Sequence, residues 1–136
     1  MLTQTAARHS GKGAIISCLA PDVCLTPMGS SMVPVPYMII SKLEWAQRTA
    51  PSITFTELEA FTMNSRTNKV TGNEAGTGGG VVSGVNAGSG WCRPRSKKSN
   101  VFVEGHELIQ NDNLYDMNCA GPDGAANTVG KLIYAD

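Results

Sequence analysis

The chain has 136 residues, and its eleven basic and eleven acidic side chains cancel to a net charge of zero. This length fits one domain of ordinary size and is too short for a two-domain enzyme. Without an excess of positive charge, the electrostatic basis for binding nucleic acid or an anionic membrane surface is missing. We therefore expect a single domain over residues 1–136 that binds no nucleic acid.

The apolar stretches are too short for a membrane span, which needs roughly 20 consecutive apolar residues. The run from Met32 to Ile40 contains two prolines, and the start MLTQTAARHSGKG lacks the apolar core of a secretory signal. We expect a polar, mobile segment at residues 1–13, no stable membrane insertion and synthesis in a reducing cytoplasm. The four cysteines are then expected to be free or metal-bound thiols rather than disulfides.

The first third of the chain is divided into extended and turn segments by prolines at positions 21, 27, 34, 36 and 51. Each proline lacks a backbone donor and restricts the residue before it. Helical spacing of apolar residues occurs only weakly, at Ile39, Ile40, Leu43 and Ala46. The pattern predicts a mainly β protein with at most one short helix.

Two later segments form an internal repeat at an offset of 48 residues, Ser52–Asn64 and Asn100–Asp112. Each is predicted to be a strand, a turn and a second strand. Glu104-Gly105 is a favourable tight turn because glycine accepts a positive φ, whereas Glu57-Leu58 is a poorer one. The offset pairs Ile53 with Val101, Phe55 with Val103, Glu59 with Glu107 and Phe61 with Ile109.

A glycine-rich run from Gly72 to Gly90 lies between the two copies. Because it contains the pair Val81-Val82, we expect ordered structure in which backbone segments approach closely, rather than a flexible linker. Glu74 is expected to pair with backbone amides in a tight turn. The basic cluster from Arg93 to Lys98 is expected to be a solvated loop, and residues 131–134 to add a last strand.

Four segments in this order carry a family resemblance: PDVCLTP from Pro21, PVPY from Pro34, GNEAGTGGGVVSG from Gly72 and NVFVEGHELIQNDN from Asn100. Together they resemble the PAAR-like domains of the DUF4150 or Tox-PAAR-like group, over about residues 14–119. The resemblance implies a small tapered β cone that sits as a monomer on a trimeric VgrG spike protein of a type VI secretion system. Such a tip is assembled in the bacterial cytoplasm and then injected into a target cell.

A trimeric base suits a monomer with three similar strand-turn-strand units in a pseudo-threefold arrangement. Two units are the repeat, and the third is expected from Gly13–Tyr37. In relatives, toxic activity resides in a fused domain, but the stretch after Cys119 is too short for one. We therefore expect any effector to bind without covalent fusion or to be carried by another spike component.

The resemblance also implies a zinc ion near the narrow point, held by histidine and cysteine. Cys24 matches the cysteine of the family's PDVC segment, and Cys119 falls near a ligand position after the last strand pair. Cys18 and His9 complete the candidate set, against the alternatives of a buried thiol for Cys18 and a mobile start for His9. The sequence has no CxxC or HxxxH spacing to support this set.

Three other positions bear on the zinc prediction, because each is a residue that the family pattern or its chemistry brings into question as a ligand. Met117 stands where many relatives carry a histidine before the asparagine, which departs from the family pattern. His106 is expected to face solvent. Cys92, beside Trp91, is expected to have a structural role in packing.

The favoured function is a structural spike tip that is not an enzyme. One alternative is a metal-stabilised adaptor that recruits a separate effector to the spike. The other is a small hydrolase with Cys24 and His106 as nucleophile and base. The glycine run lacks the lysine and Ser/Thr of a phosphate-binding loop.

Overall fold

The structure is a computed structural model that describes residue 7 and residues 14–55, 58–87, 89–95, 100–110 and 112–134. These residues are mainly β, and their helical content is one 3₁₀ turn, Leu43–Trp45. The prediction of a mainly β fold with at most one short helix is confirmed. The expectation of a mobile segment at residues 1–13 lies outside the described residues, apart from Ala7. No helix in the described part is long and apolar enough to cross a membrane.

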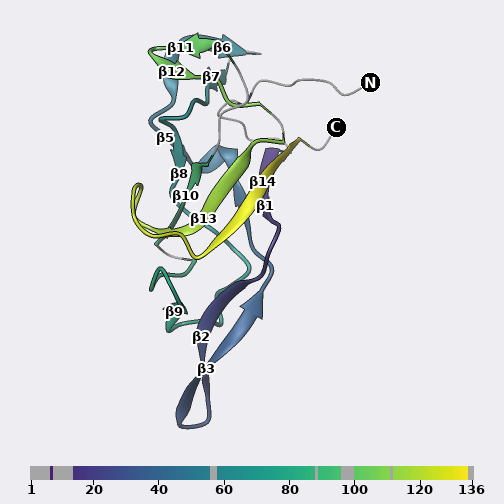
Figure 1. The fold of residues 1–136 in the computed structure, drawn as a ribbon, viewed down its shortest axis with the longest axis vertical. Coiled ribbons are helices and arrows are strands. Elements are labelled where there is room, and N and C mark those ends of the chain that lie inside the picture. The colour runs from purple at the N-terminus through teal and green to yellow at the C-terminus, as the bar shows by residue number, and fades with distance from the viewer. Residues whose placement is uncertain are drawn as a thin grey trace.

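The body of the molecule is a strongly curled antiparallel sheet of seven strands (Figure 1). Its inner face packs a core in which Phe61 and Tyr115 are fully buried, with Ile16, Met117 and Leu132 around them. Residues on β1 and β10 alternate between buried and half-buried, as expected for strands with one face on a core. The strand order is β4 (Ile40–Lys42), β1 (Ala14–Cys18), β14 (Thr128–Tyr134), β13 (Leu114–Ala120), β10 (Gly90–Pro94), β8 (Arg66–Thr67) and β5 (Ala46–Gln47).

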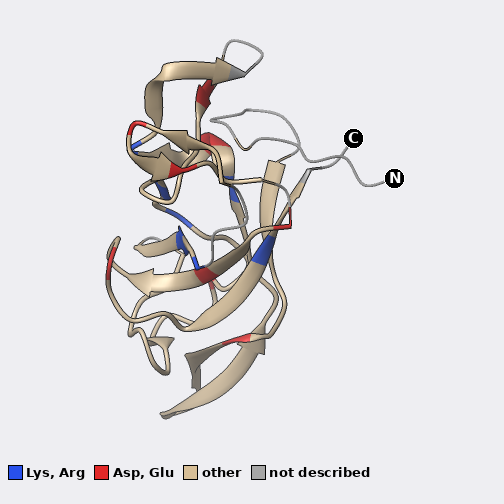
Figure 2. Ribbon diagram, turned by 45° about the horizontal axis from the view of Figure 1, so that its top comes forward, with Lys and Arg blue, Asp and Glu red and all other residues tan. Residues whose placement is uncertain are grey.

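The narrow end is a second sheet that projects from the body (Figure 1). It has the order β3 (Ser31–Tyr37), β2 (Asp22–Met28) and β9 (Gly79–Gly80). A two-residue turn joins β2 to β3, and its Gly29 has φ of 64°, which favours glycine. The sequence has no Lys, Arg, Asp or Glu between residues 23 and 41, and Figure 2 shows that the outer part of this hairpin is uncharged.

The wide end, opposite the β2–β3 hairpin, holds the two repeat hairpins (Figure 1). The first consists of β6 (Ala50–Phe55) and β7 (Leu58–Ala60), and the second of β11 (Phe102–Val103) and β12 (His106–Glu107). Glu104 and Gly105 both have positive φ, 51° and 82°, as a tight hairpin turn requires. The carboxylate of Glu104 accepts hydrogen bonds from the backbone N–H and hydroxyl of Ser52, which ties the hairpins together.

Three backbone hydrogen bonds form a closed ring among Ala7 and the residues Phe61 and Ile109, which follow the two repeat hairpins. Ala7 N–H donates to Ile109 C=O, Ile109 N–H donates to Phe61 C=O, and Phe61 N–H donates to Ala7 C=O, at 2.7, 3.0 and 2.9 Å. Phe61 and Ile109 are equivalent positions of the repeat, and all three residues are fully buried. Ala7 therefore occupies the third position of a pseudo-threefold arrangement.

The expectation that Gly13–Tyr37 supplies the third unit is wrong in its location. Residues 14–37 form β1 in the main sheet and the β2–β3 hairpin at the opposite end. Extended character alone could not locate the third position of the ring, because the three residues that form it are far apart in the sequence. The last strand, β14, begins at Thr128, three residues before its predicted start.

Candidate functional site

A buried carboxylate lies at the base of the narrow end. Asp22, the first residue of β2, is fully buried and accepts hydrogen bonds from three side-chain amides. The Nδ2 atoms of Asn73, Asn118 and Asn127 approach its oxygens to 2.7, 3.1 and 2.6 Å, and the Cys24 thiol donates at 3.2 Å. Burying an unpaired carboxylate is energetically costly. The hydrogen bonds from these donors, which the charge of the carboxylate strengthens, offset that cost.

The amide donors come from distant parts of the chain. Asn73, Asn118 and Asn127 are 51, 96 and 105 residues from Asp22. Asn73 belongs to the turn after Val70, and Asn118 lies on β13. Asn127 is the residue immediately before β14. One carboxylate therefore joins the hairpin, the glycine-rich run and the last two strands, and we call this set of four polar residues the Asp22 clasp.

Two glycines make room for the amides of the Asp22 clasp. A Cβ atom added at Gly80 would lie 2.3 Å from Asn127 Cγ, and one at Gly90 would lie 2.2 Å from Asn118 Oδ1. Neither glycine has a positive φ, so glycine is required here by space alone. Over residues 72–87 and 89–90, which the structure describes, the prediction that the glycine-rich run is ordered and closely packed is confirmed, and the run packs against the polar Asp22 clasp.

The turn at the start of this run is closed by Glu74, as predicted. Its carboxylate accepts hydrogen bonds from the Thr71 hydroxyl at 2.6 Å and from the Gly72 N–H at 2.9 Å. These two donors, the hydroxyl first, hold the pKa of Glu74 below its usual range. Glu74 therefore has a structural role in shaping the loop that carries Asn73.

The candidate zinc ligands that the structure describes are buried thiols. The Cys18 sulfur accepts a hydrogen bond from the Ile39 N–H at 3.2 Å, which fits the buried-thiol alternative. Burial raises the pKa of Cys24 to about 12, with contributions from the hydrogen bond to Asp22 and its charge. Burial likewise raises the pKa of Cys119 to about 12. Cys92 is fully buried, as predicted for packing.

The described residues contain no group of three His, Cys, Asp or Glu side chains placed to hold a metal ion. Cys18, Cys24 and Cys119 are therefore not brought together as a three-ligand set. His9 lies outside the described residues, so the full set of four stays a prediction. Met117, the departure from the family pattern, is a fully buried core residue whose sulfur packs against Gly130.

The hydrolase alternative does not fit the arrangement. His106 is exposed on β12 at the wide end, as predicted, while Cys24 lies on β2 at the opposite end (Figure 1). A nucleophilic cysteine also needs a lowered pKa, and that of Cys24 is raised. The structure therefore separates the proposed nucleophile from its base.

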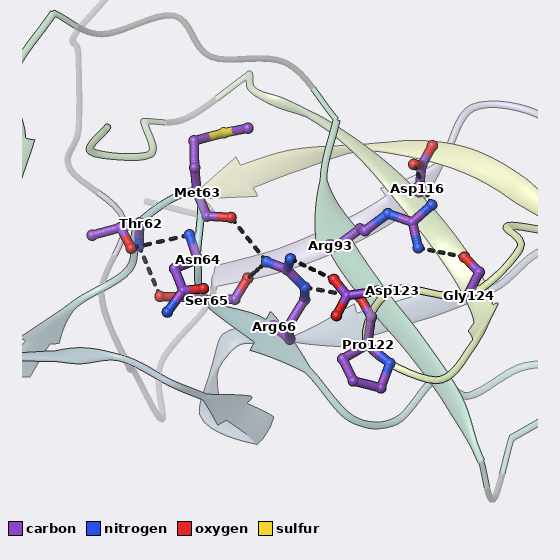
Figure 3. Close-up of polar contacts among 10 residues, drawn as sticks. All are labelled: Thr62, Met63, Asn64, Ser65, Arg66, Arg93, Asp116, Pro122, Asp123 and Gly124. Atoms are coloured by element: carbon purple, nitrogen blue, oxygen red, sulfur yellow. Dashed lines mark hydrogen bonds and ion pairs between the residues drawn. The ribbon is translucent and has the colours of Figure 1, made fainter. Parts of the chain in front are cut away.

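Arg66 fixes the loop between β13 and β14, which leads to Asn127 (Figure 3). Its guanidinium donates to the Pro122 C=O at 2.9 Å and to the Met63 C=O at 2.8 Å, and pairs with Asp123 at 3.0 Å. The hydrogen bond from Arg66 lowers the pKa of the exposed Asp123 carboxyl. This loop is thus held from one side by Arg66 and from the other by Asp22 through Asn127.

Arg93 holds the same loop from the neighbouring strand (Figure 3). It pairs with Asp116 at 3.2 Å and donates to the Gly124 C=O. The expectation of a solvated basic loop is therefore wrong for Arg93, which lies on β10 because its alternating neighbours Cys92 and Pro94 face the core. Arg95 also approaches Asp116, and residues 96–99 lie outside the described part.

Sequence reasoning did not single out Asp22, Asn73, Asn118 or Asn127 as a cluster. Asp22 and Asn73 stand inside the two motifs that carry the resemblance, PDVC and GNEAGTGGG. The structural requirement is general, because a buried carboxylate needs hydrogen-bond donors. The sequence offered no means of knowing which distant amides supply them.

The fold defines a small β domain with a pseudo-threefold ring at one end and a polar clasp at the other. Residues 15–124, well over half of the chain, match the family model described as the toxin PAAR-like domain. The chain belongs to this family. Comparison with curated proteins and with solved structures gave no significant match.

Proposed function

We propose that this protein is a structural tip that caps a trimeric VgrG spike of a type VI secretion system and is injected with it. Membership of the PAAR-like family supports a spike-related or toxin-associated role, and the family is generally structural rather than enzymatic. The observation that carries the proposal is the ring formed by Ala7, Phe61 and Ile109.

The ring matters because a cyclic trimer presents the same surface three times around its axis. A single chain can match such a surface only if it offers three similar units of its own. Phe61 and Ile109, which follow the two repeat hairpins, meet Ala7 in a threefold set of backbone hydrogen bonds, and this arrangement supports a match between one monomer and a trimeric partner.

The wide end is the proposed docking surface. Ile53 and Val101, which are equivalent in the repeat, are 41% and 56% exposed, and Phe102 beside them is 62% exposed. Exposed apolar side chains gathered at one place commonly mark a protein interface. Equivalent exposed positions on two repeat hairpins fit a partner with rotational symmetry.

The test is binding of the full chain to a trimeric VgrG spike protein from the same organism. Mass photometry is expected to give one chain per trimer. Serine at Ile53 and Val101 together should weaken binding about tenfold or more, because roughly 1.4 kcal/mol of lost apolar burial corresponds to a factor of ten.

The matched control places serine at Val81 and Val82, which are 50% and 65% exposed and follow β9 at the narrow end. This control should bind like the unaltered protein. Failure of the unaltered chain to bind the trimer, or equal loss in both double variants, would overturn the proposal.

A further inference from the structure

We propose that the narrow end of this protein is closed by a metal-independent clasp, in which the carboxylate of Asp22 is held by Asn73, Asn118 and Asn127. The clasp takes the structural place of the zinc ion that the family resemblance predicts. The proposal rests on the geometry of the described residues and holds whether or not the chain caps a spike.

The orientation of two amides is fixed independently of Asp22. The Oδ1 atom of Asn127 accepts from the backbone N–H groups of Val82 and Ser83, at 2.8 and 3.2 Å. The Nδ2 atom of Asn118 donates to the Val85 C=O at 2.8 Å. These backbone partners leave the amide nitrogens facing the carboxylate, so the cluster presents donors rather than acceptors.

A group of donors is suited to an anion and unsuited to a cation. Hard cations are bound by oxygen atoms, and zinc by thiolate, imidazole or carboxylate. Around Asp22 the amides present nitrogen, and both carboxylate oxygens already accept hydrogen bonds. The thiol of Cys24 donates to the same carboxylate at 3.2 Å. Asp22 and Cys24 are therefore used within the fold.

Two buried amide oxygens indicate that contact with the Asp22 carboxylate determines how these side chains are oriented. The Oδ1 atoms of Asn73 and Asn118 are buried and have no hydrogen-bond partner among the described residues. An unsatisfied buried acceptor is destabilising. Both side chains nevertheless direct their nitrogens to Asp22, as expected if contact with the carboxylate outweighs the loss at the other end of each amide.

The clasp also explains how the narrow end keeps its shape with little apolar core. The main core cluster lies in the body, while the outer residues of β2 and β3 are exposed. A satisfied polar network can fix one arrangement of strands where apolar volume is small. Gly80 and Gly90 allow the backbone to approach these amides.

The experiment combines metal analysis with thermal unfolding of the full chain. We expect less than about one zinc per ten chains and a midpoint unchanged by chelation, since no metal binding would contribute to folding. Asp22→Asn should lower the midpoint by about 10 °C or more, because one carboxylate serves three donors. Cys119→Ala, which removes a predicted ligand outside the clasp, should change the midpoint less and leave the metal content unaltered.

A milder variant keeps the test decisive if Asp22→Asn does not fold. Asn73→Ser removes one donor and should lower the midpoint by several degrees, equally with and without chelator. Stoichiometric zinc whose removal lowers the midpoint would overturn the proposal. So would an Asn73→Ser variant as stable as the unaltered protein, or a loss of bound zinc on changing Cys24 or Cys119.

Discussion

Asn118 allows the contribution of the Asp22 clasp to be separated from backbone strain. Its φ of 52° lies in the left-handed region, which favours glycine, and its side chain donates to Asp22 and to the Val85 C=O. Asn118→Gly removes the side chain and suits the backbone. Asn118→Ala removes the side chain and leaves a Cβ in an unfavourable conformation. Both variants lose the clasp contact, and only one adds strain.

The expected magnitudes follow from these contacts. A hydrogen bond to a charged acceptor contributes about 2 kcal/mol and a neutral one about 1, so Asn118→Gly should cost about 3 kcal/mol. Asn118→Ala adds about 1 kcal/mol for the left-handed backbone, about 4 in total. For 136 residues the entropy of unfolding is about 0.29 kcal/mol/K. The midpoints should therefore fall by about 10 and about 14 °C.

The assay is calorimetric unfolding at neutral pH, with urea titration to check that the transition remains two-state. Asn68, an exposed asparagine, provides the matched control, and Asn68→Ala should shift the midpoint by less than about 2 °C. If both Asn118 variants unfold within about 3 °C of the unaltered protein, the amide does not stabilise the narrow end. If alanine is tolerated as well as glycine, the strain argument fails.

Three further predictions test other features of the fold. Gly90→Ala should lower stability by about 1–3 kcal/mol, because the new Cβ meets Asn118 Oδ1 at 2.2 Å. Threonine at both Pro34 and Pro36 should cause self-association in size-exclusion light scattering, since β3 is an edge strand and proline withholds donors from its free edge. Stability should fall as pH rises from about 9 toward 12, because burial keeps the Cys119 thiol protonated in the folded state, with its pKa raised from 9.0 to about 12, while the unfolded chain ionises. Cys119→Ala should flatten that decline in calorimetric midpoints.

Each of these predictions has its own control. Gly29→Ala meets no atom within 4 Å and should cost only the strain of its positive φ, so a loss as large as that of Gly90→Ala would contradict the steric account. A double proline variant that stays monomeric at high concentration would show that the edge is protected otherwise. An alkaline profile identical with and without Cys119 would remove that thiol from the pH dependence.

Much of the wide end was predictable because its determinants are local. The offset of 48 identified both hairpins, and Glu104-Gly105 identified the tight turn of the second. The Val-Val pair indicated order in the glycine-rich run. These features depend on a few neighbouring residues and on backbone preferences that operate over short distances.

The third position of the ring and the polar clasp were not predictable in the same way. Ala7 has no sequence pattern that reveals its place in the ring, because its part is played by backbone groups that every residue carries. Arg93 was expected in a solvated loop, since the sequence shows its charge directly but does not show its ion pair with Asp116. The zinc ligands remain a prediction that depends partly on His9.

The sequence by itself determined the family, the mainly β class and the two repeat hairpins, since each depends on short local sequence patterns. Only the tertiary structure decided that Asp22 lies among three amides from positions 51, 96 and 105 residues away. The physical reason is that a buried carboxylate requires donors but does not specify which ones. The curvature of the sheet determines which amides reach Asp22, together with glycines that allow close approach of backbone segments distant in the sequence.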